Sequence, residues 1–234
     1  MIRIQGIAFD RMKNFCTFCK QAESQSRDHC PSKILLDEPF PTDLSVVPSC
    51  IKCNGSFSKD EEYVACAVEF LKSFHYDYDW IMNERVTNIL SMKSDLKNQL
   101  ERTYGNNSRI FKELFIDDRF ENVLIKNALG HIRFELGLYV EQIPKELKMN
   151  FLPRMDDTFK NQFESFVGEP DLFPEVGSRL LIRLFERQNL DERGWIVVQN
   201  GVYRFQLQQS VDSIKVKIVM KEFLAAEIHF DCEL

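Results

Sequence analysis

Two pairs of cysteines with the same spacing place the strongest constraint on how this chain can fold. Cys16 and Cys19 form the first Cys-x-x-Cys pair, Cys50 and Cys53 form the second, and 30 residues separate the pairs. This spacing lets both sulfurs of a pair turn toward one ion, and four thiolates satisfy the tetrahedral coordination of zinc. Because four cysteines leave no position for water, the sequence predicts a structural zinc site. The alternative is four unrelated cysteines.

The rest of the composition agrees with metal binding rather than disulfide bonding. The chain has 234 residues, of which 44% are hydrophobic and 28% charged, as expected for a globular protein. Its first 15 residues carry several charges and lack the apolar core of a signal peptide. No stretch approaches the roughly 18 apolar residues of a membrane span. We therefore expect a cytoplasmic protein in a reducing compartment, with no membrane association.

Hydrophobic periodicity predicts an α+β fold in which helices precede a small antiparallel sheet. Apolar residues recur at three- and four-residue spacing in several segments, as in amphipathic helices. The segments near the C-terminus alternate instead, and Asn200-Gly201 between two of them is typical of a type I′ hairpin turn. Helices are predicted over 60–74, 80–102, 118–141 and 178–188, loops with one short helix over 142–177, and strands over 195–199, 202–208, 214–220 and 225–230.

The interval between the cysteine pairs carries a second group of polar residues. Arg27-Asp28-His29-Cys30-Pro31 lies inside it, and Asn54 follows the last cysteine directly. The ordered set CTFC, RDHCP, PTDLSVVPSC and IKCNGSFSKDEEY resembles the HNH, or ββα-metal, endonucleases. Within that family it is most similar to the branch with a four-cysteine zinc, which includes phage endonuclease VII. The resemblance covers residues 14–65, about a quarter of the chain.

The resemblance implies a zinc-stapled ββα-metal, treble-clef-like module over residues 1–75, followed by a region of recognition or partner docking over 76–234. It implies hydrolysis of phosphodiester bonds in nucleic acid, most directly DNA, leaving 5′-phosphate ends. His29 is then the general base, because an imidazole with a pKa near 6.5 accepts a proton close to neutral pH. Asp28 and Asn54 supply hard oxygen ligands for catalytic Mg²⁺ or Mn²⁺.

The chain departs from the family pattern at three places. Asp43-Leu44 stands where the family has an Asn-Leu pair, and an aspartate accepts hydrogen bonds but does not donate them. Phe57 stands where many relatives have a lysine, with Lys59 the nearest substitute. Cys30 follows the histidine where an aliphatic residue is commoner.

Simpler interpretations of the same residues stay open. His29 is either the base, a zinc ligand or a structural histidine, and Asp28 either binds metal or caps a turn. Asn54 with the following glycine also fits an ordinary turn. Three cations near the motif are expected to contact phosphate or simply to be solvated, namely Arg27, Lys33 and Lys59.

The charge distribution bears on the partners of such a module. The chain has 30 basic and 36 acidic residues, for a net charge of −6. Residues 1–60 hold eight basic and seven acidic side chains, a charge of +1, so the remainder carries −7; four thiolates and one zinc ion bring the first segment to −1. A nuclease module without a strong basic field of its own does not bind long duplex DNA unaided.

We therefore expect a partner, such as an ATPase or sensor subunit in a bacterial antiphage defence complex, and homo-oligomer formation stays open. The alternative function is a non-catalytic zinc module that binds nucleic acid or a protein.

Overall fold

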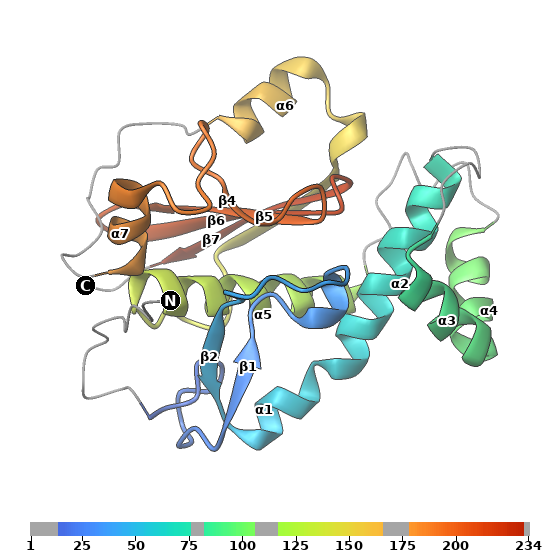
Figure 1. Cartoon of the computed structure of the whole chain (residues 1–234), viewed down its shortest axis with the longest axis horizontal. Coiled ribbons are helices and arrows are strands. Elements are labelled where there is room, and N and C mark those ends of the chain that lie inside the picture. Colours follow the sequence, from blue (N-terminus) through green and yellow to red (C-terminus); the bar gives the residue numbers. More distant parts are fainter. Residues whose placement is uncertain (1–13, 76–81, 106–116, 166–177, 232–234) are drawn as a thin grey trace.

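The computed structural model describes residues 14–75, 82–105, 117–165 and 178–231. These residues form an α+β structure, as the periodicity predicts. Helix α5 lies between a five-stranded sheet on one side and a two-stranded hairpin on the other (Figure 1). The four cysteines of the two pairs and the Asp28-His29 pair all lie on the hairpin side of α5.

The N-terminal elements follow the order strand, strand, helix. Strands β1 and β2 pair in antiparallel register, with Asp28 opposite Val47 and His29 opposite Val46. A short 3-10 helix, η2, lies in the loop between them, and α1 begins directly after β2 and is followed by the long helix α2 (Figure 1). The bounds are β1 Ser26–His29, η2 Lys33–Leu35, β2 Val46–Ser49, α1 Ile51–Ser56 and α2 Ser58–His75.

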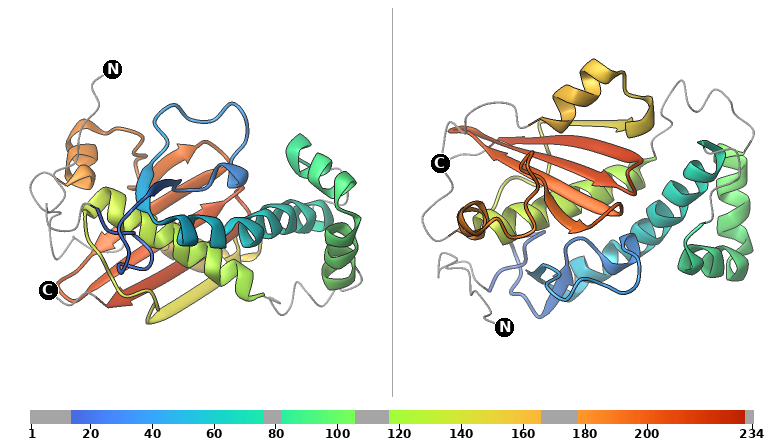
Figure 2. Two further views of the ribbon diagram at one scale, coloured as in Figure 1. Left: turned by 90° about the horizontal axis from the view of Figure 1, so that it is seen from below. Right: turned by 45° about the horizontal axis from the view of Figure 1, so that its top comes forward.

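The prediction of a single helix over 80–102 is wrong for the residues that the structure describes, because the chain forms two helices there. Helix α3 (Glu84–Met92) and helix α4 (Ser94–Tyr104) are separated by Lys93, whose φ of −117° and ψ of 76° leave the helical region. The break allows both helices to lie against α2 (Figure 2). Each buries its own residues, Val86 and Leu90 on α3 and Leu100 and Tyr104 on α4. Helix α4 ends at Gly105, as predicted; Trp80 and the predicted Asn106-Asn107 end lie outside the described residues.

Helix α5 (Asp118–Leu136) is buried on nearly every side, which the sequence did not predict. Its polar residues from Lys126 to Glu135 are as inaccessible as its apolar stripe, because the hairpin, α2 and the sheet surround this part of the helix. Three polar residues in the first turns are instead exposed, namely Asp118, Glu121 and Asn122. The helix ends at Gly137, whose φ of +75° is readily adopted by glycine. The predicted extension of the helical stripe to Tyr139 is therefore wrong.

His131 joins α5 to the sheet and is fully buried. Its Nε2 lies 2.9 Å from the hydroxyl of Tyr203, and its ring stacks on that of Phe205. Burial lowers the pKa of His131 well below its usual value, and the positive charges of Lys126 and Arg183 act in the same direction. The imidazole is therefore neutral in the folded protein.

The C-terminal sheet is antiparallel, in the order β3-β7-β6-β5-β4, and contains all the predicted strands. The hairpin at Gly201 is confirmed, but the type I′ turn is wrong. Only Gly201 of the turn has positive φ, and Gln199 pairs with Tyr203 across a three-residue loop. The bounds are β3 Glu146–Phe151, β4 Ile196–Gln199, β5 Tyr203–Gln209, β6 Ser213–Met220 and β7 Leu224–Asp231.

The far face of the sheet is also covered, so Lys217 is buried although the alternation over 214–220 is typical of a strand with one exposed face. This lysine is 1% exposed, and its ammonium donates to the carbonyls of Phe163 (2.9 Å) and Ser165 (3.0 Å). These carbonyls lie at the end of helix α6 (Asp157–Glu164), above the sheet in Figure 1. Strand β3 was predicted as loop, whereas helix α7 (Arg179–Glu186) confirms the last predicted helix.

The predicted boundary at residue 75 coincides with the end of α2, and the division into two functional regions remains a prediction. One hydrophobic core nevertheless runs across it, and it joins Val47 and Tyr63 to Leu124 and Ile132. Within the described residues, no helix combines the length and the apolar character needed to span a membrane.

Candidate functional site

The four cysteines of the two pairs come together as the sequence predicts. Their sulfur atoms all lie within 4.8 Å of one another, and those of Cys19 and Cys50 are 4.0 Å apart. Four sulfurs at 2.3 Å from a zinc ion are about 3.8 Å apart in a regular tetrahedron. The donor set and its spacing therefore fit a structural metal such as zinc, held by Cys16, Cys19, Cys50 and Cys53.

Local backbone geometry turns each pair of sulfurs inward. After the first pair, Lys20 adopts a φ of +58°, and its amide donates to the carbonyl of Cys16 at 3.0 Å, which closes a tight loop. The second pair begins helix α1, where the Cys50 sulfur caps the amide of Cys53 at 3.4 Å. Asn54 consequently lies in the first turn of α1, and its position is tied to the metal site.

The thiol of Cys19 ionises more readily than that of an ordinary cysteine, because its pKa is lowered. A hydrogen bond from the backbone of Gln21 is the largest influence on Cys19 and, with a second from Ala22, lowers its pKa to about 7. Zinc binds the thiolate, so a cysteine that ionises near neutral pH loses its proton to the metal at little cost.

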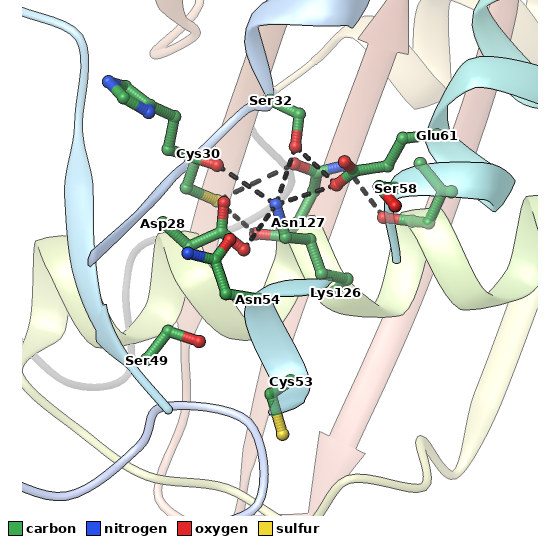
Figure 3. Close-up of polar contacts among 12 residues, drawn as sticks. Asp28, Cys30, Ser32, Ser49, Cys53, Asn54, Ser58, Glu61, Lys126 and Asn127 are labelled. Atoms are coloured by element: carbon green, nitrogen blue, oxygen red, sulfur yellow. Dashed lines mark hydrogen bonds and ion pairs between the residues drawn. The ribbon is translucent and has the colours of Figure 1, made fainter. Parts of the chain in front are cut away.

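The second site surrounds Asp28 on β1, and a lysine from α5 occupies its centre (Figure 3). The buried ammonium of Lys126 lies 3.1 Å from Asp28 Oδ2 and 2.9 Å from Glu61 Oε1. It also donates to the hydroxyl of Ser32 at 2.7 Å and to the backbone carbonyl of His29 at 3.1 Å. The Ser32 hydroxyl in turn donates to Glu61. These contacts connect β1, α2 and α5.

Burial dominates the ionisation of this network. It raises the pKa of Asp28 because the carboxylate loses hydration, although the charge of Lys126 opposes the rise. Burial also acts to lower the pKa of Lys126, but nearby negative groups, Glu61 foremost, outweigh it and raise that pKa. Lys126 therefore remains an ammonium at neutral pH and neutralises part of the charge of the two carboxylates.

Asn54 points its side chain from α1 to β1. Its amide nitrogen donates to the Ser26 hydroxyl at 3.2 Å and to the Arg27 carbonyl at 3.3 Å, so its amide oxygen faces the other way. In Figure 3 the Asn54 side chain points toward the carboxylate of Asp28. A carboxylate and an amide oxygen are the kind of ligands that hard divalent cations prefer.

His29 presents its side chain away from that of Asp28, as alternation along a strand requires. No other described residue offers its half-buried imidazole a hydrogen bond or an ion pair, and the sulfur cluster does not include it. Burial, followed by the charge of Lys33, lowers the pKa of His29. The ring is therefore neutral at neutral pH and is available to accept a proton, and the interpretation as a zinc ligand is wrong.

The three cations predicted near the motif, Arg27, Lys33 and Lys59, are all exposed. Lys33 is the one that the structure relates to the site, because its charge acts on His29 and its ammonium lies 5.4 Å from the ring centre of Phe40. A phosphate contact at any of the three remains a prediction.

Each departure from the family pattern has a structural counterpart. Asp43 accepts a hydrogen bond from the side chain of Asn189 at 2.9 Å, so a residue far along the chain anchors its loop. The ring of Phe57 makes an edge contact with Phe18 of the first cysteine loop, with 5.3 Å between centroids. Cys30 is fully buried and donates to the backbone carbonyl of Asn127 at 3.1 Å.

Lys126, Glu61 and Ser32 are the site residues that the sequence analysis missed. Lys126 was hidden because the helical stripe assigned only one face of α5 to the core, and a lysine off that stripe is usually solvated. The sequence carries no signal that relates position 126 to position 28. Comparison of the chain with protein-family models, curated proteins and solved structures gives no match.

Proposed function

We propose that this chain is a metal-dependent endonuclease of the HNH type that hydrolyses phosphodiester bonds in nucleic acid, with DNA as the first substrate to test. The observation that supports the proposal best is that Asn54 of α1 points toward the carboxylate of Asp28 on β1 (Figure 3), while His29 follows Asp28 on the same strand with its side chain on the other face. A simple zinc site gives no reason for Asn54 to point toward Asp28.

The proposed roles follow from the chemistry of each group. His29 accepts the proton of the attacking water, and its neutral imidazole suits that task. Asp28 and Asn54 hold Mg²⁺ or Mn²⁺, which supplies positive charge to the phosphate and to the departing 3′-oxygen. The zinc site fixes the start of α1 and therefore the position of Asn54 relative to β1.

The direct test is a cleavage assay on plasmid, single-stranded and branched DNA and on RNA, with Mg²⁺ and Mn²⁺ compared. We expect cleavage that requires a divalent ion and that falls about 100-fold or more in His29→Ala with its zinc retained. His229→Ala is the matched control, because His229 lies on β7 and pairs with Glu227. Full cleavage by folded His29→Ala would remove His29 from the mechanism.

One observation favours the alternative of a non-catalytic zinc module. Asp28 is paired with a buried lysine and therefore has a structural partner without any metal. Titration with Mn²⁺ separates the two functions. A nuclease binds one ion in addition to zinc and loses it in Asp28→Asn, whereas a binding module takes up no second ion.

The role of a partner is part of the same proposal. The lack of a strong positive charge in residues 1–60 supports a nuclease that acts as a subunit, for example with an ATPase or sensor in antiphage defence. Size-exclusion chromatography of the protein with and without the products of neighbouring genes tests this. Cleavage of long duplex DNA at full rate by the isolated chain would argue against a required partner.

A further inference from the structure

We propose that Lys126 of α5 is a positioning residue of the nuclease site, which holds one carboxylate oxygen of Asp28 so that the carboxylate stays turned toward Asn54. This inference rests on the proposed function and extends it to the region after residue 75. The region would then complete the active site, in addition to any part it has in recognition or docking.

The contacts of Lys126 concentrate on the strand that carries the proposed catalytic groups. Its ammonium binds Oδ2 of Asp28 at 3.1 Å and the backbone carbonyl of His29 at 3.1 Å. It therefore fixes both the side chain of one residue and the backbone of the next. A lysine that served only to neutralise Glu61 would have no need of these two contacts.

The remaining contacts keep the ammonium in place. Glu61 lies on the opposite side at 2.9 Å, and the Ser32 hydroxyl bridges Lys126 to the same carboxylate. Lys126 is 1% exposed, so water does not compete for it. Because the ammonium is held from two sides, the orientation of the Asp28 carboxylate is set before any ion binds. Preorganisation of this kind contributes to catalysis through geometry.

The charges of the network also explain why Lys126 does not simply replace a divalent ion. Two carboxylates and one ammonium leave a net charge of −1 around Asp28, and Asn54 points toward Asp28 from α1 (Figure 3). One oxygen of Asp28 is occupied by the lysine, and the other remains for a cation.

The test is Lys126→Met, which keeps the length of the side chain and removes its charge. Binding of Mn²⁺ is measured by electron paramagnetic resonance of the free ion, and cleavage is measured at saturating Mn²⁺. We expect the variant to bind Mn²⁺ through Asp28 and Asn54 but to cut about 10- to 100-fold more slowly per bound ion. If the single variant does not fold, Glu61→Gln/Lys126→Met removes the repulsion between the buried carboxylates and takes its place.

Arg183→Met is the matched control. Arg183 is a buried cation that pairs with Glu135 at the other end of α5, at 2.9 Å. A purely structural role predicts that Mn²⁺ binding and cleavage fall together with the folded fraction, as in the control. Equal cleavage per bound Mn²⁺ in Lys126→Met and the wild type would overturn the positioning role alone. A wild-type protein that binds no Mn²⁺ and cuts no substrate would overturn the proposed function, and this inference with it.

Discussion

The contact between α5 and the end of β1 leaves no space for a methyl group at Gly130. A Cβ atom built at this position would lie 2.3 Å from the sulfur of Cys30 and 3.0 Å from its Cβ. Non-bonded carbon contacts are ordinarily about 3.5–4.0 Å long. Gly130→Ala therefore requires α5 and β1 to separate by about 1 Å, at the strand segment that carries Asp28 and His29.

Two opposing terms set the size of the effect. Overpacking of this kind costs about 1–3 kcal/mol, whereas alanine is favoured over glycine inside a helix by about 1 kcal/mol. Because two atoms of Cys30 lie so close, the overpacking cost falls in the upper part of its range, about 2–3 kcal/mol, and we expect Gly130→Ala to lower the free energy of unfolding by about 1–2 kcal/mol. In a Cys30→Ala background the sulfur is absent, so the penalty shrinks by at least about 1 kcal/mol.

The wild type, Gly130→Ala, Cys30→Ala and the double variant form a double-mutant cycle. Urea denaturation of the zinc-loaded proteins, followed by circular dichroism, measures the free energy of unfolding of all four. Gly55→Ala is the matched control, because Gly55 also lies in a helix but a Cβ there meets no atom within 4 Å. That variant is expected to be neutral or slightly stabilising. The reasoning fails if Gly130→Ala has the same effect in both backgrounds, within about 0.3 kcal/mol.

Three further predictions concern the metal, the sheet and the buried histidine. Cys53→Ser should lose the zinc measured by mass spectrometry, whereas Cys66→Ala, buried on α2 away from the cluster, should keep it; retained zinc in the first variant would contradict the four-sulfur site. Lys217→Met should lower the free energy of unfolding by about 1–3 kcal/mol because it leaves buried carbonyls without a donor, and a similar loss in the partly exposed Lys215→Met would refute that reason. The folded state keeps His131 neutral, whereas the unfolded chain protonates it below pH 6.5. The free energy of unfolding should therefore fall by up to about 1.4 kcal/mol per pH unit below pH 6.5 because of this residue. If His131→Gln shows the same dependence of the free energy of unfolding on pH, His131 is not its cause.

The four-cysteine cluster was predictable because its signal is local, whereas the strand, strand, helix order of the N-terminal elements was expected only from the family resemblance. A two-residue spacing between cysteines is a property of the chain itself, and it remains whatever the rest of the protein does. The hairpin at Gly201 was predictable for the same reason, since glycine readily adopts the positive φ that the turn requires. Its turn type was not, because the loop length depends on how β4 and β5 pair.

The burial of Lys217 and the break at Lys93 have a different cause, which is contact with elements elsewhere in the chain. Lys217 lies in a strand that alternates like a half-exposed one, and only α6 above it makes the position buried. The break at Lys93 likewise reflects contacts of α3 and α4 with α2, because helical periodicity continues through it in the sequence.

The sequence by itself determined which residues are able to hold zinc, and it singled out Asp28, His29 and Asn54 by their order along the chain. Only the tertiary structure decided that Asn54 points toward Asp28, and that Lys126, 98 positions after Asp28, lies against the same carboxylate. The physical reason is that a ligand pair within one turn is fixed by local backbone geometry. A buried ammonium instead depends on which helix the core places beside it, and that choice is made by packing across the whole chain.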